Sequence, residues 1–153
     1  MSDLASVNSL LAEIAEANDG VNHSSDYSLN MLPPAESMQL ALEAYFSAMS
    51  TSNSDPQPPE RWNIRTREVT DVTRYLLAAT RRWFYDLEFS PKLDRVTAER
   101  TIKEFMDRLV SIVGTSKVFE VKVHPPMWYE CVWQDFVFDG GNCRWFLHFG
   151  FSD

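Results

Sequence analysis

Apolar residues recur at helical spacing over three stretches of the chain. Five aliphatic residues fall three or four positions apart between residues 4 and 14, and Asp19-Gly20 follows as a stop signal. A second stripe covers residues 38–49. The cleanest one runs from Val96 to Val113 and is followed by Gly114, which suits the position just after a helix. These three stretches are predicted to be helices.

A fourth, longer helix is predicted at roughly Thr66–Leu87. Its apolar stripe consists of Val69, Val72, Leu76, Ala79 and Trp83. Arg67, Arg74 and Arg81 recur every seven residues and would share another face of this helix. That face is expected to be solvated or to contact the acidic N-terminal part; a phosphate-binding stripe is the alternative, because arginine suits bidentate phosphate contacts.

Polar and proline-containing segments separate the predicted helices. Residues 20–34 have no clear period, and residues 50–60 (STSNSDPQPPE) lack apolar residues and are typical of a loop. The segment SPKLD breaks the chain again, with Ser90 before Pro91 as the expected cap of the next helix.

After Gly114 the apolar period changes from 3.6 to 2, which predicts strands. Phe119, Val121 and Val123 alternate with polar residues, and two further strands follow in WYECVWQDFVF and CRWFLHFGF. The prediction is therefore an α+β fold of about four N-terminal helices followed by a C-terminal three-stranded antiparallel β-meander packed on them. The length fits a single domain, 1–153, with an acidic helical part (1–60), two core helices (61–114) and the sheet (115–153).

The Gly140-Gly141 pair predicts a two-residue hairpin that sorts the C-terminal side chains onto two faces. This hairpin would place Asp135 opposite Phe146, and Trp133 opposite His148. Because side chains alternate across a sheet, an apolar face would pack on the helices. Its residues are Val132, Phe136, Phe138, Cys143, Trp145, Leu147, Phe149 and Phe151, with Glu130 and Gln134 as polar exceptions. A turn at His124–Met127 would add Phe119, Val121 and Val123 to that face.

The opposite face would mix aromatic and charged side chains, a composition typical of a binding hot spot. The candidate partner-binding residues are Glu120, Lys122, Tyr129, Trp133, Asp135, Arg144, Phe146 and His148. Two alternatives stay open: the acidic N-terminal segment covers this face within the molecule, or a second copy of the chain covers it as a homodimer.

The charge is distributed unevenly and favours a basic protein as the partner. Residues 1–60 hold nine acidic and no basic residues, residues 61–114 have a net charge of +3, and the whole chain has −8. A net-acidic chain repels nucleic acid, so a nucleic-acid partner is not expected. The asymmetry also fits docking of the acidic part on the basic middle within one molecule.

Neither a membrane span nor a disulfide framework is predicted. No apolar run approaches the ~18 residues of a membrane span, and the first basic residue is Arg61, so no signal or transit peptide is expected. The two cysteines, Cys131 and Cys143, would lie on opposite faces of the sheet. These features favour the cytoplasm.

Catalytic and metal chemistry is considered and not predicted. Cys131, His148 and Asp135 share a face and could be named as nucleophile, base and orienting acid, but no oxyanion-hole element accompanies them. A metal site would draw on His124, His148, Glu120 and Asp135, whose spacing matches no ligand motif. No catalytic residue, metal or cofactor is therefore expected.

In general character, a small acidic domain with an aromatic face resembles bacterial immunity proteins and other protein inhibitors, many of which neutralise basic nucleases. The resemblance implies a non-enzymatic inhibitor or immunity-type protein that binds a basic toxin or nuclease, steered by charge. The alternative is a small-molecule-binding or enzymatic domain with a pocket between the Val96–Val113 helix and the inner sheet face, or a structural homodimer.

Overall fold

The computed structural model describes residues 3–51, 58–88 and 90–153. Four α-helices lie in these ranges: α1 (Leu4–Ala17), α2 (Met38–Thr51), α3 (Val72–Tyr85) and α4 (Arg95–Val113). A short 3-10 helix, η1 (Pro59–Trp62), follows α2. The strands are β1 (Ser24–Met31), β2 (Arg65–Glu68), β3 (Lys117–Lys122), β4 (Val132–Asp139) and β5 (Arg144–Ser152).

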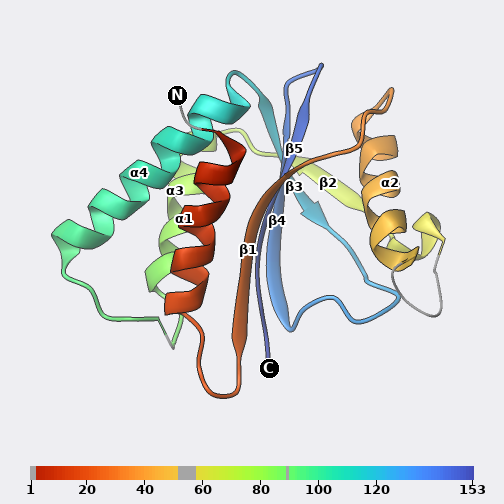
Figure 1. Ribbon diagram of the computed structural model, residues 1–153. Helices are drawn as coiled ribbons and strands as arrows, with labels where there is room; N and C mark the ends of the chain where they lie inside the picture. The colour runs from red at the N-terminus through yellow and green to blue at the C-terminus, as the bar shows by residue number, and fades with distance from the viewer. Residues whose placement is uncertain (1–2, 52–57, 89) are drawn as a thin grey trace.

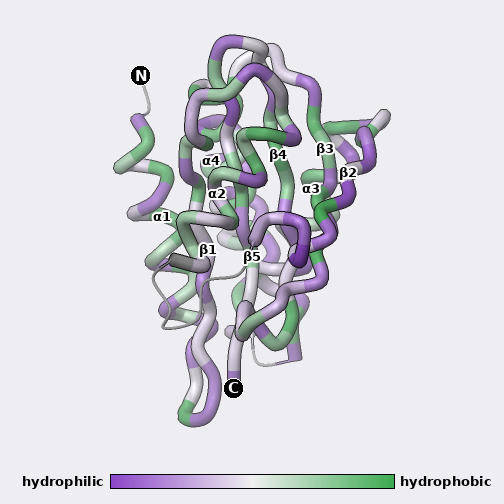
Figure 2. The backbone as a smooth tube through the Cα atoms, turned by 90° about the vertical axis from the view of Figure 1, so that its right-hand side faces the viewer, coloured by the Kyte–Doolittle hydropathy of each residue, from purple (hydrophilic) through white to green (hydrophobic). Residues whose placement is uncertain are grey.

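The strands form one antiparallel sheet in the order β1-β5-β4-β3-β2. Helices α1, α3 and α4 lie on one side of this sheet and α2 lies on the other (Figure 1). Figure 2, viewed from the α2 side, shows the strand order from β1 at one edge to β2 at the other. The predicted α+β class is confirmed, but the three-stranded meander was too small, because a strand from the N-terminal half flanks it on each side.

Both additional strands come from segments that the sequence pattern assigned otherwise. β1 lies within residues 20–34, where its alternation is short and rests on buried Tyr27 and Leu29 among polar residues. β2 lies where a helix was predicted, and its four side chains are all exposed. The helix α3 begins only at Val72, after Asp71, whose side chain accepts a hydrogen bond from the Arg74 N–H at 3.4 Å. Tertiary pairing with β3 has overridden the helical period.

Helix ends follow local capping chemistry. The carboxylates of Asp3 and Asp94 accept hydrogen bonds from Ser6 and Thr97 N–H groups, so they cap α1 and α4. Asp94, and not the predicted Ser90, is therefore the cap of α4. Gly114 ends this helix with a φ of 58°, which favours glycine, as predicted. In the predicted 50–60 loop, residues 52–57 lie outside the described residues.

The β4–β5 register differs from the predicted one by two residues. Asp139 pairs with Arg144, so Asp135 lies opposite His148 and Val137 opposite Phe146. A two-residue shift leaves every side chain on the same face. The predicted face assignment for these two strands is therefore confirmed although the individual pairs are wrong.

The predicted pairing of β3 with β4 differs from the observed one by an odd number of residues. Each side chain of β3 therefore lies on the opposite side of the sheet from the predicted one. Phe119 lies opposite Val137, and Val121 opposite Asp135, so both share the α2 side of the sheet. Glu120 and Lys122 consequently lie on the side of α1, α3 and α4. The cause is the length of the β3–β4 connection: β3 ends at Lys122 and β4 begins at Val132, where the sequence had suggested a tight turn.

The sheet has a hydrophobic core on each side. One core joins β1, β4 and β5 to α1, α3 and α4, and its aromatic members include Tyr27, Trp83, Phe84, Phe105 and Phe149. The second joins the opposite side of the sheet to α2 and η1 and contains Leu42, Phe46, Trp62, Val121, Val137 and Phe146. The sheet is therefore buried on both sides over much of its area.

Candidate functional site

The sheet side that carries Trp133, Asp135, Val137, Phe146 and His148, hereafter the α2 face, is covered at its apolar end by α2. The ring of Phe146 lies 5.8 Å from that of Phe46 and 4.7 Å from that of Tyr45, measured between centroids. Trp62 stacks on Phe46 at 4.6 Å. The acidic N-terminal part thus covers this face within the molecule, and a homodimer through the same residues would have to displace α2.

The structure brings six of the eight predicted partner-binding residues to the α2 face. They are Tyr129, Trp133, Asp135, Arg144, Phe146 and His148, whereas Glu120 and Lys122 lie on the opposite side. Asp135, Phe146, His148 and Glu120 are buried. Tyr129, Trp133 and Arg144 are half-buried, and only Lys122 is exposed. The four buried residues are therefore covered by other parts of the molecule in this structure.

Arg144 forms its ion pair with Asp139 and not with Asp135. Its Nε donates to Asp139 Oδ1 at 3.1 Å, and its Nη1 donates to the Ala35 carbonyl at 2.9 Å. Both partners follow from the observed register, since Asp139 lies directly opposite Arg144. The guanidinium therefore ties the segment before α2 to the end of the β4–β5 hairpin.

Glu120 is buried in a polar network on the other side of the sheet. Its carboxylate accepts hydrogen bonds from the Tyr75 hydroxyl and, at 3.3 Å, from Gln134 Nε2. Lys122 Nζ and Arg67 Nη2 lie 3.3 and 3.6 Å from Glu120 Oε1. Gln134 Oε1 accepts a hydrogen bond from Trp83 Nε1 at 2.8 Å. The oxygen and the nitrogen of the Gln134 amide, which was predicted as a polar exception on the apolar face, therefore both have hydrogen-bond partners.

We expect Glu120→Gln to destabilise the protein in a pH-dependent manner. Burial alone would raise the pKa of Glu120, but the hydrogen bonds from Tyr75 and Gln134 and the charge of Lys122 outweigh it, so the pKa is lowered. A lowered pKa contributes stability above the unfolded pKa, which is lost as pH falls through the folded value. Urea unfolding at pH 7 should show that the free energy of unfolding falls by about 1.5–3 kcal/mol, the usual contribution of hydrogen bonds to a charged group.

The same comparison below pH 4 should show a smaller difference between Glu120→Gln and the wild type. Glu88→Gln, at an exposed carboxylate, serves as the control and should leave stability unchanged at both pH values. A difference that stayed constant with pH would contradict the assignment of a stabilising charge to Glu120.

The polar end of the α2 face is built around His148. Its Nδ1 lies 2.5 Å from Asp135 Oδ1 and 3.2 Å from the Tyr129 hydroxyl oxygen. The Tyr129 hydroxyl donates to the other oxygen of Asp135 at 2.8 Å. Asp135 and His148 face each other across the β4–β5 ladder, so the backbone pairing fixes this contact.

Burial and charge act against each other in this pair. Burial raises the pKa of Asp135, and the neighbouring His148 opposes that effect only in part. Burial alone would lower the pKa of His148, but the negative charge and hydrogen bond of Asp135 and the hydrogen bond to Glu130 raise it to about 10. Burial and the nearby Asp135 also raise the pKa of Tyr129, so its hydroxyl stays protonated and donates. At neutral pH the His148 imidazole is therefore positively charged.

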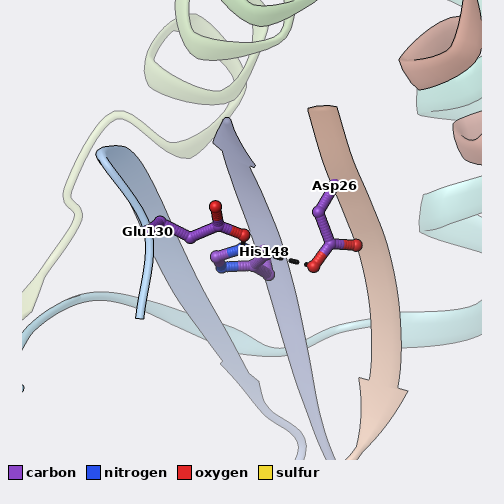
Figure 3. Close-up of side chains that lie close together, drawn as sticks. All are labelled: Asp26, Glu130 and His148. Atoms are coloured by element: carbon purple, nitrogen blue, oxygen red, sulfur yellow. Dashed lines mark hydrogen bonds and ion pairs between the residues drawn. The ribbon is translucent and has the colours of Figure 1, made fainter. Parts of the chain in front are cut away.

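Two further carboxylates approach the other ring nitrogen of His148 from different elements. Glu130, just before β4, places Oε1 at 3.3 Å from Nε2, and Asp26 of β1 places Oδ2 at 3.9 Å (Figure 3). The Ser152 hydroxyl donates to the second oxygen of Glu130. We call Asp26, Glu130, Asp135 and His148 the His148 cluster.

Sequence reasoning found half of this cluster. Asp135 and His148 were among the predicted partner-binding residues. Asp26 lies in β1, within the segment 20–34, whose sequence shows no clear hydrophobic period. Glu130 was noticed only as a polar residue expected on the core face. Cys131, named with them as a candidate nucleophile, instead accepts a contact from the Asp153 N–H at 3.4 Å. Both cysteines are free.

A cavity of about 450 Å³ lies between α1, α4 and the segment after α3. Its lining includes Ile14, Phe84, Leu93 and Arg108. The predicted pocket position, between the α4 helix and the inner sheet face, is instead filled by core residues such as Phe105 and Phe149.

Comparisons with known proteins give no family and no function. No family model matches the chain, and no curated protein matches it. A solved structure, the crystal structure of citrus MAF1, aligns with 94% of this chain and 98% of its own, with a TM-score of 0.42 and 11% sequence identity. A likeness this weak carries no argument about function. In the described part of the chain, no helix has the length and apolar character needed to span a membrane.

Proposed function

We propose that this protein is a non-enzymatic binding module of the inhibitor or immunity type, which neutralises a basic partner protein such as a toxin or nuclease. One observation carries the proposal: the acidic charge of residues 1–60 is not neutralised by the basic middle of the chain. Among the described residues, no acid of this part forms an ion pair with a lysine or arginine.

Several basic residues of the middle segment form ion pairs with acids outside residues 1–60. Arg81 pairs with Glu99, Lys103 with Asp107, and Arg108 with Glu104. The acids at positions 3, 13, 16, 19, 26, 36 and 60 are exposed. They therefore create a negative potential in solvent, which accelerates association with a basic protein and disfavours acidic ones.

The aromatic anchor of the binding surface has to be an exposed ring, since Phe146 is buried beneath α2. Trp128, with 68% of its surface exposed, meets this condition and lies in the connection between β3 and β4. In the same connection, the ring centroid of Tyr129 lies 5.2 Å from that of Trp133 in β4. Tryptophan is enriched among residues that dominate binding energy. In this proposal the N-terminal acids steer the partner and Trp128 anchors it.

We expect removal of three N-terminal charges to slow partner association. The variant Glu13→Gln/Glu16→Gln/Glu36→Gln changes exposed side chains only. The matched control, Glu68→Gln/Glu88→Gln/Asp153→Asn, removes the same charge from exposed positions outside the N-terminal part. A basic protein captured from the native host by the wild-type chain would be purified and its association rate measured at low and physiological ionic strength.

The N-terminal triple variant should associate about tenfold more slowly at low salt, at the lower end of electrostatic steering effects. The control variant should stay near the wild-type rate, and Trp128→Ala should act on dissociation instead. Capture of no basic protein, or an equal loss in both triple variants, would contradict the proposal.

Binding of a small molecule is a second candidate, favoured by the cavity between α1 and α4, whose volume of about 450 Å³ is in the range of ligand pockets. Thermal unfolding in the presence of a metabolite collection distinguishes the two functions. The variant Ala17→Leu places a larger side chain in the lining of this cavity. A metabolite that stabilises the wild type but not this variant would favour the small-molecule function over partner binding.

A further inference from the structure

Three ligand-bearing side chains from distant parts of the chain converge at one end of the sheet. Asp26 comes from β1, Glu130 from the segment before β4, and His148 from β5, and one ligand atom of each lies within 4.8 Å of the others. Figure 3 shows His148 between the two carboxylates. We propose that Asp26, Glu130 and His148 form a binding site for a divalent transition-metal ion of the Zn²⁺ type.

The distances fit such an ion with little movement. Zinc binds imidazole nitrogen and carboxylate oxygen at about 2.0–2.2 Å in a tetrahedron, so neighbouring ligand atoms lie roughly 3.3–3.6 Å apart. His148 Nε2 is 3.3 Å from Glu130 Oε1 and 3.9 Å from Asp26 Oδ2. Glu130 Oε1 is already at this distance from Nε2, and the exposed side chain of Asp26 has to move closer to both other ligands, since the three ligand atoms lie within 4.8 Å of one another.

A second layer of residues holds His148 in the orientation that a metal ligand needs. Metal-binding histidines usually donate the N–H of their other ring nitrogen to a carboxylate, which fixes the tautomer and the ring plane. Asp135 Oδ1 lies 2.5 Å from Nδ1 and can accept this proton, while the Tyr129 hydroxyl holds the other oxygen of Asp135. The lone pair of Nε2 then points toward Glu130 and Asp26.

The charge of the cluster also favours a cation. Asp26, Glu130 and Asp135 surround a single imidazole, and among the described residues none of the three forms an ion pair with a lysine or arginine. Even with His148 protonated, the four side chains carry two net negative charges. A dication bound in place of the Nε2 proton would compensate the carboxylates, two of which are shielded from solvent.

The backbone leaves room for this arrangement at Gly150. A Cβ at this position would lie 2.8 Å from His148 Nε2 and 2.9 Å from Glu130 Cγ, closer than side chains tolerate. The absence of a side chain at Gly150 therefore allows both ligands to meet above β5. Ser152, two residues further on the same face, holds the second oxygen of Glu130.

The mixed nitrogen and oxygen ligand set indicates the kind of ion. Imidazole suits zinc and its first-row neighbours, whereas magnesium and calcium favour oxygen ligands alone. With three protein ligands, one position of the tetrahedron remains for water, which is the pattern of open zinc sites. Asp26, exposed over 66% of its side chain, lies on the solvent side. Of the three ligands, only His148 was considered as a metal ligand from the sequence, because positions 26, 130 and 148 form no spacing motif.

The test is titration of the chelator-treated full-length chain with Zn²⁺ by calorimetry, and with Co²⁺ by visible absorption. We expect one ion per chain, the absorption pattern of a tetrahedral Co²⁺ ion, and an increase in thermal stability with Zn²⁺. Asp26→Asn, at an exposed position, should keep the fold and weaken Zn²⁺ binding by at least tenfold. Asp135→Asn should weaken it by about 10–100-fold through misorientation of His148.

Two controls separate this site from nonspecific binding. His124→Gln removes an exposed histidine, and Glu36→Gln an exposed acid, at positions outside the cluster; both should bind Zn²⁺ as the wild type does. Gly150→Ala should abolish binding, with its folding checked by circular dichroism. Equal Zn²⁺ affinity in Asp26→Asn, Glu130→Gln and the wild type, or no tetrahedral Co²⁺ signal in the wild type, would overturn the proposal.

Discussion

His148→Ala is expected to lower the free energy of unfolding of the metal-free protein by about 3–5 kcal/mol, the usual cost of removing one member of a buried ion pair. The carboxylate of Asp135 has no exposed surface, and His148 is the positive group beside it. Without the imidazole, the buried carboxylate of Asp135 would keep only the Tyr129 hydroxyl as a hydrogen-bond donor. For a chain of this size the melting temperature should fall by about 6–20 °C.

A double substitution distinguishes the loss of an ion pair from simple loss of packing. His148→Leu/Asp135→Leu replaces both charged side chains with apolar ones, and such replacement of a whole buried pair is often close to neutral. We expect the double variant to be clearly more stable than His148→Ala in urea titrations with a chelator present. His124→Ala, at an exposed histidine, should change stability by no more than about 0.5 kcal/mol. A double variant less stable than His148→Ala would contradict this account.

Trp62→Ala is expected to destabilise the protein by about 3–5 kcal/mol, as large-to-small changes in a core do. Trp62 is fully buried, stacks on Phe46 and donates its Nε1–H to the Ser50 hydroxyl at 3.0 Å. Its removal would leave a hole between η1, α2 and the sheet. Amide hydrogen exchange should therefore rise most strongly in α2, since this helix contacts the sheet through the core that Trp62 completes.

A second tryptophan supplies the matched control. Trp128 is 68% exposed, so Trp128→Ala should leave the unfolding free energy within about 0.5 kcal/mol of the wild type. If the two tryptophan variants lost the same amount of stability, α2 and η1 would not cover the sheet as described. The comparison thus tests directly whether the acidic N-terminal part closes the α2 face.

The proposed partner surface and the proposed metal site share one residue, Asp26, and otherwise use different side chains. Trp128 and the exposed N-terminal acids serve the first, and Asp26 is the one acid that they share with the His148 cluster. Loss of Zn²⁺ binding in Asp26→Asn without an effect on partner association would leave the partner proposal intact. The two proposals can therefore fail separately.

Local pattern was sufficient for the helices whose apolar stripe faces one core. α1, α2 and α4 lie close to their predicted ranges, and Gly114 ends α4 as expected. The strands β4 and β5 were also found, and their faces survived a register error because the error was of two residues. In these elements each residue's neighbours in the sequence determine its environment.

Long-range pairing decided the rest. β1 exists because it lies beside β5, and β2 because it lies beside β3, although neither has a strong strand pattern of its own. The register of β3 depended on a connection whose length the prolines did not reveal, and one odd shift moved Glu120 from the α2 face to the side of α3.

The sequence by itself determined the α+β class, the four helices, of which α3 begins later than predicted, and the separation of the C-terminal side chains into two faces. Only the tertiary structure decided what covers the second face and which acids meet at His148. The physical reason is that Asp26, Glu130 and His148 are joined by the order of strands in the sheet. Strand order depends on contacts between residues far apart along the chain, which hydrophobic periodicity does not record.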